Sequence, residues 1–543
     1  MSLDWVEPYG NPTIGVDHLG MRVAGEAAYG HLIDFTTTVT YRPRYLSFLC
    51  WSLREAWSQH ARSENEDDFL VDYDQWRDLI KQHDFAFGAA SLAADPGTAR
   101  VVGSRALTRL LSQGTDAISN TADHVRGRGS IDIYAGILRS LELSAGAQGV
   151  ERAVGAVSED LAELFDAVLG PEGRDLLHSQ ELTLERLRDV GRIAGVSQLR
   201  PAGASKEAVA AERALLRKII IPIERTHELQ VRRRLASIGV IIRLHEALGG
   251  DVDSGDFRSA VLDRVVLDED QSHHIPFAAG YDEVLGNWRW YQVRAYAVHA
   301  LEVLLAAVLA KTRELGRLAG SIGAPVERVI ASLLVEAEMC EDSLPSDLRG
   351  LASMPAEDCL SHLAGRIRSG ADRLEMEPDI SRRMNQAEPD SGERTATALT
   401  LYLMSLARMR VLREQEGTDA WLGDDREVHG PPWRFLEQSD AALAGRRSCR
   451  ELLGEVVRDF VIRQHVRNAY RKLEADPSSK DTSRLVLEEG CVRRVGDLHS
   501  PGSSYPRYEN AVSFLTDLGY LNEEREPTDE GIDLAEEIEG ALF

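Results

Sequence analysis

Near the C-terminus the sequence reads Tyr508-Glu509-Asn510-Ala511-Val512-Ser513-Phe514-Leu515-Thr516-Asp517-Leu518-Gly519-Tyr520-Leu521, followed by Pro527-Thr528-Asp529-Glu530-Gly531. The apolar residues Ala511, Phe514, Leu515 and Leu518 recur at helical spacing. Gly519 follows the last of them, where a helix favours a residue in the left-handed conformation. Thr528 is suited to cap a second helix over residues 529–538. The stretch therefore predicts two helices joined by a short excursion.

This pattern resembles the last helices and wing of winged-helix domains. In those domains a helix ending in leucine-x-x-leucine-glycine-leucine is followed by leucine-threonine-x-x-glycine. The resemblance covers the last part of the chain and implies a recognition module, which binds either DNA or another protein.

Basic residues precede this module on a predicted helix over residues 449–473. Arg463, Arg467 and Arg471 are four residues apart and so share one face of that helix. Further basic residues are Lys472, Arg493, Arg494 and Arg507. We interpret this set as a surface that binds nucleic acid or a partner protein. Docking onto a partner protein, with the arginines paired to acids, is the alternative.

A second group of candidate binding residues lies near the N-terminus. Arg42 and Arg44 flank Pro43 and stand beside Tyr41 and Tyr45. Arginines in such a setting are suited to grip a phosphate or a carboxylate. The alternative is an ordinary helix start, with the arginines paired to local acids such as Glu55.

Three stretches resemble a group of uncharacterised prokaryotic proteins that tend to be encoded beside restriction and phage-defence genes. The first is Asp17-His18-Leu19-Gly20-Met21-Arg22, continued from Thr37 to Trp51. The second is Trp288-Arg289-Trp290-Tyr291-Gln292-Val293-Arg294, continued to Glu302, and the third is Gln464-His465 with Ala469 and Lys472-Leu473. This resemblance implies a defence-associated protein and assigns no catalytic residue.

Composition restricts the class of protein. The chain has 543 residues and a net charge of -26, and only six of its 62 basic residues are lysines. Such an acidic, arginine-biased chain is typical of a high-GC genome and a high-salt cytoplasm, with an ordinary acidic actinobacterial protein as the alternative. The five cysteines are widely spaced, which favours reduced thiols in a cytosol.

No motif in the sequence assigns a reaction. GxxxxGK[ST], HExxH and GxSxG are all absent. We expect no catalytic residues, no metal and no cofactor. Because catalytic carboxylates need not be close in sequence, a cryptic metal-dependent nuclease stays an alternative.

The rest of the chain reads as helices separated by breaks. We predict helices at 159–169, 208–221, 225–248, 325–345 and 395–415, a polar linker at 251–287, and loops at 375–394 and 418–433. The longest apolar run, residues 295–310, contains His299 and Glu302 and is short for a membrane span, so we predict a buried helix.

The fold expected from the sequence is mainly α, with several domains. We place an N-terminal region at 1–130, irregular at first and then helical, a central helical domain at 131–440, and a basic helix with a winged-helix-like α/β module at 441–543. The expected function is that of a non-catalytic subunit of a cytoplasmic antiviral-defence or DNA-processing assembly. Its partner would be a protein of the same operon, with DNA possible and no membrane. A stand-alone DNA-binding regulator is a second alternative, besides the nuclease.

Overall fold

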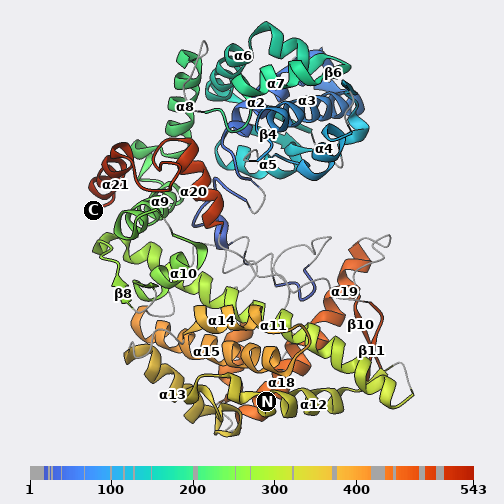
Figure 1. Cartoon of the computed structure of the whole chain (residues 1–543), viewed down its shortest axis with the longest axis vertical. Coiled ribbons are helices and arrows are strands. Elements are labelled where there is room, and N and C mark those ends of the chain that lie inside the picture. The colour runs from blue at the N-terminus through green and yellow to red at the C-terminus, as the bar shows by residue number, and fades with distance from the viewer. Residues whose placement is uncertain are drawn as a thin grey trace. The chain divides into compact units, whose positions relative to one another are not determined.

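The computed structural model is mainly helical, as the sequence predicts (Figure 1). It describes residues 17–21, 25, 28–37, 40–65, 68–97, 101–113, 116–125, 129–147, 150–199, 206–250, 252–268, 271–320, 323–369, 376–416, 434–443, 448–475, 483–496 and 507–543. The predicted loop at 418–433 lies outside these residues, as does Arg22.

Packing divides the chain into two compact units. Unit 1 comprises Met1–Leu32 and Gly255–Tyr505, and unit 2 comprises Ile33–Ser254 and Pro506–Phe543. Each unit is thus built from segments that are far apart in sequence. The boundaries expected near residues 130 and 440 stay a prediction.

Unit 2 is organised around α2 (Arg44–His60), whose residues Tyr45 to Leu53 are all buried. This helix packs against α3 (Tyr73–Ala94) and α6 (Gly155–His178). The other helices are α4 (Ser104–Leu111), α5 (Ser130–Ser140), α7 (Leu184–Ala194), α8 (Lys206–Ile220), α9 (Leu229–Leu248), α20 (Tyr508–Asp517) and α21 (Asp529–Leu542). Three antiparallel pairs complete the unit: β1 (Ala61–Asn65) with β2 (Asp68–Val71), β3 (Ala117–Ser119) with β6 (Glu181–Thr183), and β4 (Ser144–Ala147) with β5 (Val150–Ala153).

The stretch at the C-terminus folds locally as predicted. Helix α20 ends before Gly519, which has a φ of 83°. The Thr528 hydroxyl accepts from the amide of Gly531, 3.2 Å away, and caps α21. A Cβ atom on Gly531 would lie 2.1 Å from the carbonyl oxygen of Tyr520, so glycine is required for this close approach. Helix α21 then packs against α9, and Arg243 of α9 forms a bidentate pair with Glu539 at 2.8 Å.

Unit 1 is built on α11 (Asp282–Leu318), a buried helix of 37 residues. It packs along α15 (Gly392–Glu416), as Figure 1 shows. The segment Ala279–Leu318 is long and apolar enough to cross a membrane, but 89% of its most apolar window is buried inside the protein. The buried helix predicted at 295–310 is therefore confirmed.

Further helices surround this pair. They are α10 (Ser254–Asp263), α12 (Val326–Met339), α13 (Ala356–Ser369), α14 (Glu377–Gln386), α17 (Arg434–Leu443), α18 (Cys449–Val456) and α19 (Gln464–Ala475), with a π-helical segment (Val457–Arg463) joining the last two. Strands β7 (Val265–Asp268) and β8 (Gln271–His274) form a hairpin. A three-stranded antiparallel sheet has the order β10 (Leu485–Glu488), β11 (Cys491–Arg494), β9 (Gly323–Pro325).

Two predictions of irregular structure were wrong. The polar linker expected at 251–287 contains α10, the β7–β8 hairpin and the start of α11, and the loop expected at 375–394 contains α14. In both cases a few apolar side chains are buried in the core of the unit: Phe257 and Val261 from α10, and Ile380 and Met384 from α14. Tertiary burial stabilises these short helices although their sequences are largely polar.

Candidate binding surface on helix α19

Helix α19 extends α18 through the π-helical segment, so residues 449–475 form one continuous helical rod. Ser448 and Glu451 form a capping box at its start. The helix predicted over residues 449–473 is therefore confirmed. Single π-helical turns are uncommon and occur often at functional sites, which directs attention to this helix.

The inner face of α19 holds the backbone of residues 17–19. Gln464 donates to the carbonyl oxygen of Leu19 (2.8 Å), and Nδ1 of His465 donates to that of His18 (3.0 Å). The carbonyl oxygen of Asp17 accepts from Asn468 (2.8 Å) and from Nζ of Lys472 (2.6 Å). All four of these α19 side chains are buried. This face therefore anchors the segment, and Lys472, predicted to bind nucleic acid or a partner, is part of the anchor.

Arg294 of α11 holds the same segment from another side. It is buried and donates from its guanidinium to the carbonyl oxygen of Met21. Burial lowers the pKa of this guanidinium to about 10. A Cβ atom on Gly25 would lie 2.5 Å from Nη1 of Arg294. Parts of all three stretches that resemble the defence-associated proteins thus meet in unit 1.

The outer face of α19 is basic and partly aromatic. Arg463 has a side chain that is 57% exposed and pairs with Asp459 at 2.8 Å. Arg467 and Tyr470 are also exposed, the latter by 59%, and Arg471 is half-buried. This arrangement is consistent with the prediction that Arg463, Arg467 and Arg471 share one face of the helix. Tyr470 was not among the predicted site residues, although its position beside Arg471 was a signal for it.

The β10–β11 hairpin, whose strand β10 packs against α19, carries two more of the predicted residues. Arg493 pairs with Glu488 at 3.1 Å, and Arg494 donates from Nε to the carbonyl oxygen of Gly496 at 3.1 Å. Both arginines are half-buried. Five predicted arginines therefore lie on the π-helical segment, α19 and the neighbouring hairpin.

The remaining predicted residues belong to unit 2 and serve its fold. The Arg44 side chain is fully buried, pairs with Glu212 at 2.7 Å and donates to the carbonyl oxygens of Ile193, Gly195 and Gln198. Arg42 pairs with Asp517 at 2.6 Å, and Arg507 donates to the carbonyl oxygen of Thr36 at 2.7 Å. The prediction that Arg44 binds a ligand is wrong, because its guanidinium is buried and already paired within the protein. Glu55, the acid expected to pair locally, pairs with Arg54 instead.

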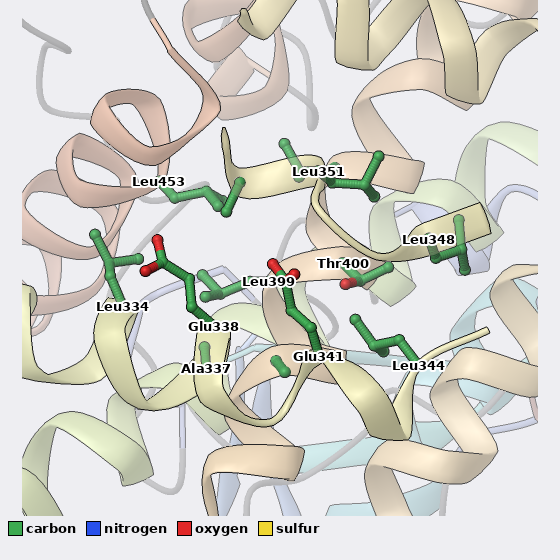
Figure 2. Close-up of a pocket in the computed structure, with 13 residues that line it drawn as sticks. Leu334, Ala337, Glu338, Glu341, Leu344, Leu348, Leu351, Leu399, Thr400 and Leu453 are labelled. Carbon is green, nitrogen blue, oxygen red and sulfur yellow. The ribbon is translucent and has the colours of Figure 1, made fainter. Parts of the chain in front are cut away.

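An apolar pocket lies elsewhere in unit 1, between α12, α15 and α18 (Figure 2). It is a shallow depression whose walls include Leu334, Leu344, Leu399 and Leu453. Figure 2 shows the side chains of Glu338 and Glu341 directed into this space. These two acids had not been singled out from the sequence, because nothing in it marks the segment as a pocket wall.

Both pocket acids have partners on the chain. Glu338 pairs with Arg450, and Glu341 accepts from the amide of Gly350 at 2.8 Å. They also come from one short segment, whereas a hydrolytic centre of the kind considered above would gather acids from distant segments. Among the residues that the structure describes, no group of three or more His, Cys, Asp or Glu side chains is placed to hold a metal ion.

Comparison with known proteins gives no family for this chain: no family model, no curated protein and no solved structure matches it.

Proposed function

We propose that this chain binds nucleic acid through the outer face of α19 and the β10–β11 hairpin, as a non-catalytic subunit of a prokaryotic defence or DNA-processing assembly. The observation that carries the proposal is the division of α19 into two faces. Its inner face holds residues 17–19, while its outer face presents Arg467 and Tyr470 to solvent, next to the exposed Arg463 at the end of the π-helical segment. A helix held rigidly from behind is a suitable element to place in a groove of DNA.

The order of elements supports a winged-helix-like reader. Strand β9 lies between α11 and α12, and β10 and β11 are the next strands after α19 in the described part of the chain. The sheet order β10-β11-β9 resembles that of a winged-helix sheet, in which α19 would correspond to the end of the third helix and the hairpin to the wing. Helices α13, α14, α15, α17 and α18 lie between α12 and α19 and would be an insertion in such a domain. In this proposal the wing would be residues 485–494, upstream of the excursion at 520–527 that the sequence pattern suggested.

Local charge is consistent with this function. The described residues of the π-helical segment, α19 and the hairpin include seven basic and four acidic side chains, in a chain whose net charge is -26. Arginine contributes contacts to phosphate, and an exposed tyrosine can stack on a base. Because the rest of the protein surface is acidic and repels nucleic acid, we expect nucleic acid to bind only at this surface.

Fluorescence anisotropy with a labelled duplex, a labelled single strand and the full chain at several salt concentrations tests the proposal. Arg467→Glu should weaken binding and reduce the slope of log K against log salt, by about 0.9 if one phosphate contact to duplex DNA is lost. Tyr470→Ala should weaken single-strand binding more than duplex binding. Arg382→Glu is the matched control, since Arg382 is an exposed helical arginine of unit 1 outside this surface.

If neither the duplex nor the single strand binds, or if Arg467→Glu and Arg382→Glu weaken binding equally, nucleic-acid binding by this surface is contradicted.

Purification of the tagged chain from its host at native salt tests the subunit role. A stoichiometric protein lost from the Arg467→Glu variant, with no nucleic acid retained, would identify the surface as a protein-docking face instead.

A further inference from the structure

Helix α12 of unit 1 has an exposed apolar face. Its inner side is buried through residues that include Val329 and Leu333. Its outer side presents Val335 and Met339, which are one turn apart and have exposed fractions of 45% and 79%. Ala331, one turn before Val335, is exposed as well. A single exposed apolar side chain is ordinary on a protein surface, but a row of them along one helix is suited to a contact with another protein.

Charged residues of opposite sign mark the two ends of this face. Arg328, seven positions before Val335, is exposed. Asp342, seven positions after Val335, lies in the 3-10 turn (Glu341–Ser343) that follows α12, and its side chain is 97% exposed. It also pairs with Arg349 of its own chain at 3.3 Å. Residues seven apart return to roughly the same side of a helix, so the face runs from a positive end through an apolar centre to a negative end.

This face is complementary to an antiparallel copy of itself. In a two-fold symmetric contact between two helices, each residue lies opposite the residue that is equally far along the chain on the other side of the axis. With the axis at Val335, the small Ala331 of each copy lies opposite the long Met339 of the other. Arg328 of each copy lies near Asp342 of the other, so unlike charges meet twice. A parallel arrangement would place like charges together instead.

We propose that this face of α12 is an interface between two copies of the chain, which pack antiparallel about a two-fold axis at Val335. The row of side chains at intervals of four residues is the kind of ridge that fits into the groove of a facing helix. Stable interfaces bury about 1,200–2,000 Å² in total, which is more than a face of about four helical turns provides. The dimer is therefore weak and reversible.

Sedimentation velocity of the full chain over a wide range of concentrations tests the interface. The wild type should pass from monomer to dimer as its concentration rises. Met339→Glu should weaken dimerisation roughly tenfold or more, because each dimer would bury two unpaired carboxylates. Ile193→Glu is the matched control and should dimerise like the wild type, since Ile193 is 47% exposed, much like Val335, but lies on α7 of unit 2. Circular dichroism checks that both variants keep their fold.

Exchange of the two end charges distinguishes a second copy from any other partner. Arg328→Asp and Asp342→Arg should each weaken dimerisation, because each change places like charges opposite one another. The double variant should recover dimerisation, since unlike charges then meet again in the reverse sense. An equimolar mixture of the two single variants should also recover it, because each variant supplies the charge that the other lacks.

A wild type that stays monomeric at every concentration, or a dimer that Met339→Glu leaves unchanged, would overturn the proposal. Failure of both the double variant and the mixture to recover dimerisation would overturn the antiparallel pairing. A monomeric wild type that retains a stoichiometric protein from its host, lost in Met339→Glu, would assign the face to that protein instead. The face is separate from the nucleic-acid surface proposed above, so the two proposals stand or fall independently.

Discussion

Nδ1 of His465 donates a hydrogen bond to the backbone carbonyl oxygen of His18, 3.0 Å away, across 447 positions of sequence. On the other side of the ring, Nε2 accepts from the amide of Arg484 at 2.9 Å. These two bonds specify the neutral imidazole with its proton on Nδ1. His465 therefore connects three segments: the one around His18, helix α19 and the start of the β10–β11 hairpin.

The stability of the protein should fall as the pH falls from about 6.5 to about 4. Burial lowers the pKa of His465 to about 4 and that of His245 to about 4. Between these pH values the histidines are protonated in the unfolded chain but not in the folded chain, so acid favours unfolding. Above pH 6.5 both states are neutral at these histidines, and their contribution to the unfolding free energy is fully present. Each histidine contributes on the order of 3 kcal/mol.

Urea unfolding between pH 7.5 and 4.5 measures this dependence, with His465→Gln as the comparison. Glutamine does not titrate, so the loss of unfolding free energy between these pH values should be smaller in the variant. Carboxylates contribute equally to both proteins and cancel in the difference. Identical pH profiles would contradict the lowered pKa of His465.

Removing the buried ammonium of Lys472 should destabilise unit 1. Its Nζ donates to the carbonyl oxygen of Asp17, and Lys472→Met keeps the length of the side chain but not the donor. The carbonyl oxygen keeps its bond from Asn468, so the loss is that of one hydrogen bond from a charged donor, about 1.5–3 kcal/mol of unfolding free energy. Arg467→Met, on the exposed face of the same helix, should cost less than about 0.5 kcal/mol. Chemical denaturation checks both, and equal losses would mean that the two faces are not distinct.

The buried pair Arg44–Glu212 should show strong coupling. Arg44→Met leaves the Glu212 carboxylate buried without its partner, and Glu212→Leu leaves the guanidinium in the same state. Each single change should cost about 3–5 kcal/mol, and the double variant should cost much less than their sum. A double-mutant cycle by urea unfolding measures the coupling. Additive losses would show that the two side chains act separately.

Two glycines of α21 should respond oppositely to alanine. A Cβ atom on Gly531 would meet the carbonyl oxygen of Tyr520 at 2.1 Å, whereas one on Gly540 would meet nothing within 4 Å. Gly531→Ala should lower the unfolding free energy by about 1–3 kcal/mol through steric displacement. Gly540→Ala should raise it by up to about 1 kcal/mol through helix propensity. Thermal denaturation of both variants measures these changes. A Gly531→Ala variant as stable as the wild type would contradict the close packing of α21.

Local chemistry was sufficient to predict much of the helical structure. The helix over 449–473, the end of α20 at Gly519 and the cap of α21 at Thr528 are set by interactions within a few residues. Helical periodicity and capping depend on neighbours along the chain, which the sequence displays directly. The spacing of Arg463, Arg467 and Arg471 on one face is predictable for the same reason.

Tertiary structure alone decided which residues are available for binding. Lys472 and Arg471 are adjacent, yet one holds the carbonyl oxygen of Asp17 and the other is half-buried near the outer face. Arg44 pairs with Glu212, 168 residues away, and His83 meets His178, 95 residues away. Local periodicity places residues on a face of a helix, but it carries no information about which distant segment covers that face. The anchor, the buried ion pair and the histidine pair depend on such long-range packing.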